Sequence, residues 1–145
     1  MKRIFLILLL CLCLTGCQPG KAQQEIYHDD TLIARSYDSE LYIMHISQTK
    51  DGARIESFDS FTGADTCKKF TVGRTEETLS YAVTAAIDAG EWKLVLVAPD
   101  GTVTTLLEGS GETEGELTLT KGKWRIKSVG LACEGEFTLT AETRK

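Results

Sequence analysis

The sequence predicts an all-β protein, folded as an antiparallel sandwich of about eight or nine strands, and two observations favour this fold. Apolar and polar residues alternate along most of the chain after residue 30, which is the period of strands with one buried face. Turn-forming residues interrupt the alternation at intervals of about ten residues, a spacing typical of antiparallel sandwiches and barrels. We therefore expect a single β-domain over residues 31–145.

The clearest strands are expected at Leu79–Ile87 and Glu91–Ala98, joined by a turn at Ala89-Gly90. In the first segment every second residue is apolar. Residues 75–89 also contain many helix formers, but the alternation favours a strand over a helix. The second segment lacks polar residues between positions 94 and 98, which indicates a central strand covered on both faces.

A hairpin is expected at Pro99-Asp100-Gly101, because proline pre-sets the turn angle, aspartate bonds locally and glycine accepts a positive φ. Residues 108–116 hold three glycines and four glutamates and predict an exposed loop. A turn is expected at Lys121-Gly122 and a loop near Gly130. The remaining expected strands cover residues 41–46, 54–58, 68–72, 102–107, 117–120, 123–129 and 136–141.

Three later stretches, GEWKLVLVAPDG, KGKWRIKSVG and EGEFTL, follow a regular strand-turn rhythm. This rhythm resembles that of small jelly-roll or immunoglobulin-like accessory domains of secreted bacterial proteins, and the resemblance covers residues 58–141. It implies a sandwich of that type. The chain departs from true immunoglobulin domains, because Trp92 lies too far after Cys67 and Leu131 stands where the tyrosine before the second cysteine is expected.

The N-terminus has the three parts of a secretory signal: Lys2 and Arg3, an apolar run over residues 4–14, and small residues before Cys17. The run is shorter than the about 20 residues that span a bilayer. The order Leu14-Thr15-Gly16-Cys17 resembles the bacterial lipobox, which implies that residues 1–16 are removed and that Cys17 carries diacylglycerol and fatty acid such as palmitate. An ordinary cleaved signal is the alternative.

This resemblance implies a protein anchored to the extracytoplasmic face of the cell membrane by the lipid on Cys17, or to the outer membrane of a Gram-negative host, since Gln18 rather than aspartate follows. Two or more acyl chains hold a protein firmly to a membrane. Residues 17–30 are polar and lack apolar periodicity, so we expect the lipidated cysteine and a flexible tether there.

The chain is acidic, with a net charge of −5, and two of its positive charges lie in the signal. Nucleic-acid partners need clustered Lys and Arg, so we expect none. Beyond Cys17, Cys67 and Cys133 remain. An extracytoplasmic pair predicts a disulfide, with two buried free cysteines or a reactive nucleophile as alternatives.

No catalytic or metal-binding motif is apparent, and we expect no enzyme, no metal and no cofactor besides the lipid. His28 lies in the expected tether and His45 in an expected strand, and no local motif pairs His45 with a cysteine. Calcium could bind Asp59, Asp65 or the glutamates of residues 108–116, but a solvated acidic loop is the simpler interpretation. The aromatic residues could form a sugar-binding platform, but their apolar neighbours favour the core; they are Tyr42, Tyr81, Trp92 and Trp124.

These observations predict a membrane-anchored, non-catalytic binding or structural module of the cell envelope, with an envelope protein or glycan as its partner. The first alternative is an envelope inhibitor or chaperone that pairs an edge strand with a client. The second is a hydrolase that uses a thiol.

Overall fold

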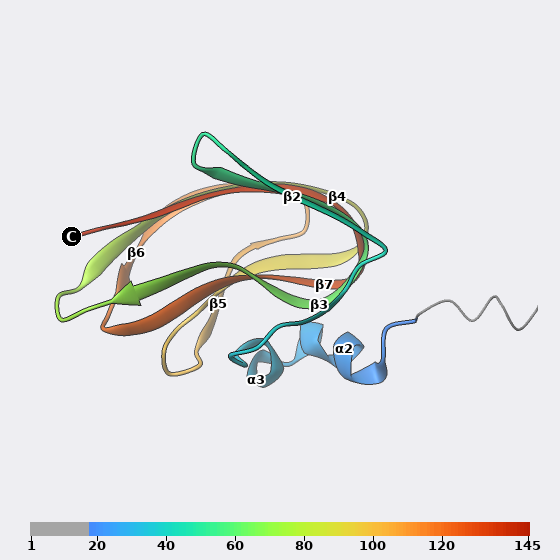
Figure 1. Cartoon of the computed structure of the whole chain (residues 1–145), viewed down its shortest axis with the longest axis horizontal. Coiled ribbons are helices and arrows are strands. Elements are labelled where there is room, and N and C mark those ends of the chain that lie inside the picture. The colour runs from blue at the N-terminus through green and yellow to red at the C-terminus, as the bar shows by residue number, and fades with distance from the viewer. Residues whose placement is uncertain (1–17) are drawn as a thin grey trace, which may run out of the picture.

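The computed structural model describes residues 18–145, so the expected signal (1–16) and Cys17 lie outside the described residues. Three short helical segments come first and seven strands follow (Figure 1). The helical segments are α2 (Lys21–Glu25), η1 (Ile26–His28) and α3 (Asp30–Ile33). The strands are β1 (Ser39–Leu41), β2 (Met44–Lys50), β3 (Ala53–Val72), β4 (Glu77–Val97), β5 (Val103–Glu108), β6 (Gly111–Leu119) and β7 (Gly122–Arg144). The all-β antiparallel fold is confirmed, with seven strands in the described chain rather than eight or nine.

The strands form two facing layers, and the helical segments lie against only one of them (Figure 1). What we call the open layer contains β2, residues 53–59 of β3, residues 134–144 of β7, residues 77–88 of β4, and β6, in that order. The covered layer contains β1, residues 62–72 of β3, residues 122–131 of β7, residues 91–97 of β4, and β5. Each layer therefore has five strand segments.

The expected strand number is too high because β3, β4 and β7 each run through both layers. Where a turn was expected at Ala89-Gly90 and a loop near Gly130, the register shifts but the strand continues. Such bulges bend a strand without ending it. Gly90 makes one bend possible: its φ is +73°, and a Cβ there would lie 2.2 Å from the carbonyl oxygen of Ala132.

The expected loop over residues 108–116 is also wrong, because most of it is the edge strand β6. β6 pairs with residues 77–85 of β4, which leaves Gly109 and Ser110 as the turn after β5. Its outward positions are three glutamates and Thr118, and its inward positions are small residues or leucine. Polar and less polar residues therefore alternate along β6, although few of its residues are apolar. The hairpin at Pro99-Asp100-Gly101 is confirmed: it joins β4 to β5, and Asp100 accepts a hydrogen bond from the Thr102 amide at 2.9 Å.

The main core lies between the two layers. Leu79, Val83, Trp92 and Leu94 are buried there, as the alternation along β4 predicts. The indole N–H of Trp92 donates to the Ser128 hydroxyl at 2.8 Å, which satisfies its polar atom. Trp124 and Tyr81 pack partly buried against the same core, and so does Tyr42. The aromatic residues thus belong to the core rather than to an exposed platform.

The expected flexible tether is wrong for residues 21–30, because the helical segments pack on the outer face of the covered layer. Ile26, Tyr27 and Ile33 are buried there in a second core against the strand residues Val95, Val97 and Val129. The folded domain therefore begins well before residue 31. Within residues 18–145 no helix has the length and apolar character to cross a bilayer.

Polar contacts fix α3 on this face. Asp29 caps its N-terminus by accepting from the amides of Thr31 (2.8 Å) and Leu32 (3.3 Å). At its other end Arg125 of β7 donates to the carbonyl oxygen of Ala34 at 2.7 Å, and Lys127 donates to that of Arg35 at 2.8 Å. Both cations lie where the carbonyl groups at a helix C-terminus favour positive charge.

Candidate functional site

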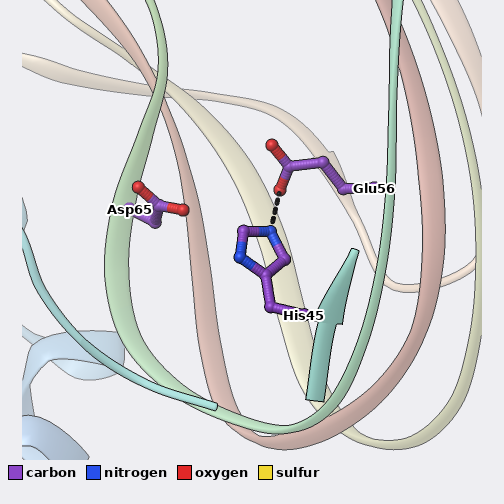
Figure 2. A group of neighbouring side chains, drawn as sticks. All are labelled: His45, Glu56 and Asp65. Atoms are coloured by element: carbon purple, nitrogen blue, oxygen red, sulfur yellow. Dashed lines mark hydrogen bonds and ion pairs between the residues drawn. The ribbon is translucent and has the colours of Figure 1, made fainter. Parts of the chain in front are cut away.

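A cluster of three ionisable side chains lies where β2 and β3 meet at one end of the main core. One metal-ligating atom each from His45, Glu56 and Asp65 lies within 4.8 Å of the others. Figure 2 shows the His45 ring between the two carboxylates, with Nε2 facing Glu56. The distance from Nε2 to Oε2 of Glu56 is 3.4 Å. The Glu56 side chain has no exposed surface, whereas that of His45 is 26% exposed.

The bend in β3 brings the cluster together. Glu56 precedes the register shifts between Phe58 and Gly63, and Asp65 follows them, so the two carboxylates come from different layers. β2 runs antiparallel to the first part of β3 and pairs His45 with Phe58, which leaves His45 diagonal to Glu56. Since inward residues of neighbouring strands share one face, the imidazole reaches the buried carboxylate.

A ring of other groups holds the three side chains in place. The Tyr42 hydroxyl donates to Oδ2 of Asp65 at 3.0 Å, and the Tyr42 ring stacks on His45 with centroids 4.1 Å apart. Arg54 forms an ion pair with Oε1 of Glu56 and donates to the carbonyl oxygen of Cys67 at 2.9 Å. Burial and the charge of Asp65 raise the pKa of Tyr42, so its hydroxyl remains a donor. Arg54 thus occupies Oε1 of Glu56 and Tyr42 occupies Oδ2 of Asp65, while Oε2 of Glu56 faces Nε2 of His45.

The expected disulfide is absent: Cys67 and Cys133 are both buried free thiols. In the pairing of β3 with β7, Cys133 lies opposite Phe61, six residues before Cys67 along β3. Six extended residues cover about 20 Å of strand, and a disulfide needs Cα atoms closer than about 7 Å. The arrangement matches the alternative of two buried free cysteines.

Neither thiol has the surroundings of a nucleophile. Burial, with a further contribution from the charge of Glu56, raises the pKa of Cys67 well above its usual value. Burial also raises the pKa of Cys133 to about 12. Reactive cysteines instead have a lowered pKa and partial exposure. Both side chains remain protonated at neutral pH and serve as packing groups.

The outer surface of the open layer, which we call the open face, carries a different set of residues. Its central positions are small, including Ser80, Ala82, Thr84 and Ala86 of β4. Acidic side chains surround them; they are Asp59, Asp88, Glu112, Glu114, Glu116, Glu134, Glu136 and Glu142. Arg144, which forms an ion pair with Glu116, offsets part of this charge. The open face is therefore a strongly acidic surface.

The open face is hollowed, and one of its edges is apolar. A hollow of about 320 Å³ is lined by Met44, Ser57, Asp59, Asp88 and Glu136, among others. Beside it, β2 forms the edge of the layer, and all seven of its residues are exposed. Met44 and Ile46 of β2 are 51% and 52% exposed, and Ile43 just before it is 74% exposed. Apolar surface thus adjoins acidic surface.

Cationic residues gather instead on the outer side of the covered layer, beyond α3. A cavity of about 640 Å³ there is lined by Lys69, Lys123, Arg125, Pro99, Phe70 and Trp124. Arg125 already donates to the carbonyl groups at the end of α3. The basic residues on β3 and β7 alternate with core residues in the sequence, so they come together only when the two strands pair.

The structure separates the residues singled out in the sequence. His45 and Asp65 come together in the cluster, whereas His28 is exposed on η1. Asp59 and the glutamates of β6 lie on the open face rather than in a loop. Sequence reasoning missed Glu56, because a glutamate at an inward strand position gives no signal unless its partners are known.

No protein-family model matches the chain, and no curated protein matches it. Among solved structures, a mutant of a family 29 carbohydrate-binding module in complex with mannohexaose is similar to it. The TM-score is 0.42 and the sequence identity 12%, over 73% of this chain and 80% of that chain. This likeness is distant and assigns no ligand to the protein.

Proposed function

We propose that the protein is a lipid-anchored, non-catalytic binding module of the bacterial envelope, and that its open face binds a positively charged surface of another envelope protein. The observation that carries this proposal is the difference between the two outer faces of the sandwich. Helical segments cover one face, and the other is hollowed, acidic and not covered by any of residues 18–145.

The position of the helical segments supports an outward orientation of the open face. α2 begins four residues after Cys17, a span of at most about 14 Å. A lipid on Cys17 would therefore hold the covered layer near the membrane, because α2 lies on that side of the sandwich (Figure 1). The open face would then point away from the bilayer, toward partners in the envelope.

Charge and shape support a cationic protein as the partner. Acidic side chains border the hollow on the open face, and the exposed apolar residues Met44 and Ile46 adjoin it. A Lys- or Arg-bearing surface with apolar residues at its margin complements such a face, and electrostatic complementarity favours fast and specific association. A non-catalytic role agrees with the protonated state of the thiols of Cys67 and Cys133.

Photo-crosslinking in the bacterium that produces the protein tests this function. A photoreactive amino acid at Thr84, in the centre of the open face, should give one discrete protein adduct. The same amino acid at Glu25, exposed on α2, is the matched control and should not give it. Replacing Glu112, Glu114 and Glu136 with Gln should abolish the adduct, because these changes remove the charge that attracts the partner. Equal adducts from both positions, or none from Thr84, would contradict the proposal.

The same experiment separates the alternatives. An adduct of high mass that a cell-wall hydrolase releases would indicate a glycan partner instead. Edge-strand pairing is favoured by one observation, the full exposure of β2 with Ile43, Met44 and Ile46. If Ile46→Lys abolishes the adduct and the three Glu→Gln changes do not, β2 binds a client strand.

A thiol hydrolase would instead lose its activity in Cys67→Ser.

A further inference from the structure

We propose that His45, Glu56 and Asp65 form a binding site for a divalent transition-metal ion of the zinc class. The sequence has no metal-binding motif, and only the fold brings the three side chains together. β2 supplies the imidazole, and the two parts of β3 on either side of its bend supply the carboxylates. The site is distinct from the open face and does not depend on any partner.

The separation of the ligand atoms suits such an ion. Nε2 of His45 lies 3.4 Å from Oε2 of Glu56, which is long for a hydrogen bond between these groups. In a tetrahedral site with bonds of about 2.0–2.2 Å, neighbouring ligand atoms are about 3.4 Å apart. One ligand atom from each of the three residues lies within 4.8 Å of the others, so the Asp65 carboxylate would have to move closer to bind the same ion.

The contacts around the three residues match the outer shell of a metal site. Ligating carboxylates are usually hydrogen-bonded through their second oxygen, and ligating imidazoles are fixed in orientation by a neighbour. Here Arg54 contacts Oε1 of Glu56, and the Tyr42 hydroxyl donates to Oδ2 of Asp65. The Tyr42 ring also stacks on His45. Oε2 of Glu56 and one oxygen of Asp65 therefore remain for the ion.

The donor set favours a transition metal over calcium or magnesium. Ca²⁺ and Mg²⁺ prefer oxygen ligands alone, whereas imidazole nitrogen suits zinc and its neighbours in the first transition series. Two carboxylates supply two negative charges at a point where Glu56 is fully buried, and a dication neutralises them. Arg54 offsets part of that charge, so we expect a moderate rather than a very high affinity.

The exposure of the cluster provides a route for the ion. The His45 side chain is 26% exposed on the edge strand β2, while Glu56 lies beneath it with no exposed surface. An ion can therefore enter from the side of the imidazole and keep water as its remaining ligand. Three protein ligands plus water is an established arrangement for zinc. The ion would join β2 to both parts of β3 and rigidify this end of the sandwich.

Zinc titration of the full chain in detergent tests the proposal. The protein is purified without a polyhistidine tag and freed of metal with a chelator, and Zn²⁺ binding is followed by calorimetry. We expect one Zn²⁺ per chain. Binding should be lost in His45→Gln and in Asp65→Asn, which change side chains that are not fully buried. His28→Gln, the matched control on η1, should bind like the wild type.

Two further measurements separate ligation from a change in folding. Tyr42→Phe keeps the stacked ring but removes the hydroxyl that orients Asp65, so we expect about tenfold weaker binding. Co²⁺ bound at the site should give the visible absorption bands of a low-coordinate cobalt ion, and His45→Gln should remove them. Melting curves in the presence of chelator verify that each variant is folded. Absence of Zn²⁺ binding by the wild type, or equal binding by folded His45→Gln, would overturn the proposal.

Discussion

The two outer faces of this sandwich come from the same three long strands, yet they meet their surroundings in opposite ways. On the covered layer, the outward residues of β4 and β7 include Val95, Val97 and Val129, and the helical segments bury them. On the open layer, the outward residues of the same strands are Thr84, Ala86, Glu136 and others, and nothing in the described chain covers them. The outward residues of one face therefore stabilise the fold through burial, whereas those of the other remain exposed to solvent.

Truncating a residue on the covered face should lower the free energy of unfolding much more than truncating one on the open face. Ile33→Ala in α3 should lower the free energy of unfolding by about 2–5 kcal/mol, because Ile33 is completely buried against the covered layer. Thr84→Ala on the open face should change it by less than about 0.5 kcal/mol. Urea unfolding followed by circular dichroism measures both values. Equal values would mean that the helical segments add little to the stability of the covered layer.

A smaller loss of folding stability is expected when the polar contacts beneath the helical segments are removed. The Lys127 side chain is fully buried, and its Nζ lies 3.2 Å from Oδ1 of Asp38. Nζ also donates to the carbonyl oxygen of Arg35. Asp38→Asn removes the negative charge that faces Lys127 and should lower the free energy of unfolding by about 1–3 kcal/mol. The carbonyl contacts remain, which keeps this cost below that of an entirely unpaired buried lysine.

The same variant should show a defined pH dependence. Burial acts to raise the pKa of Asp38, but hydrogen bonds from Thr66 and Lys127 outweigh it and lower the pKa below the usual value. The ionised carboxylate therefore stabilises the folded state above the usual pKa of about 3.9, and this stabilisation is lost as the pH falls through the lower folded value. The free energy of unfolding of wild type and of Asp38→Asn should be measured at pH 7 and below pH 4. The difference between the two proteins should be smaller at the lower pH. A difference that stays constant with pH would exclude ionised Asp38 as its source.

The contrast between the faces also explains how far the sequence predicts the structure. Alternation along β4 correctly predicts the buried side of Leu79, Val83 and Trp92, because inward positions on a strand follow its period. The expectation of two separate strands on either side of Gly90 is wrong, because a glycine with positive φ is compatible with both a tight turn and a bulge. Whether the chain turns or bends there depends on the partner strand, which local sequence does not specify.

The covering helical segments could not be predicted for a related reason. Helical segments of three to five residues are too short to show the period of a helix, and their stability comes from packing rather than propensity. Ile26, Tyr27 and Ile33 therefore lie in two short apolar groups within a polar segment, which show no helical period. The cluster is equally hidden: His45, Glu56 and Asp65 are about ten residues apart, and only the hairpin of β2 with β3 and the bend in β3 bring them together.

The smallest expected effect concerns the acidic charge that the open face retains. Glu112 and Glu114 lie two residues apart on the same side of β6, and Glu136 projects from the nearby β7, so their like charges repel one another in the folded state. Changing all three to Gln should raise the free energy of unfolding by a few tenths of a kcal/mol at low ionic strength. Added salt should stabilise the wild type more than this variant, because salt screens the repulsion between the glutamates; the Debye length is about 10 Å at 0.1 M ionic strength. Glu76→Gln, an exposed change in the connection between β3 and β4, is the control and should leave the response to salt unchanged. An identical response to salt in wild type and in the triple variant would show that the open face carries no strain from its charge, and that its acidity costs the fold nothing.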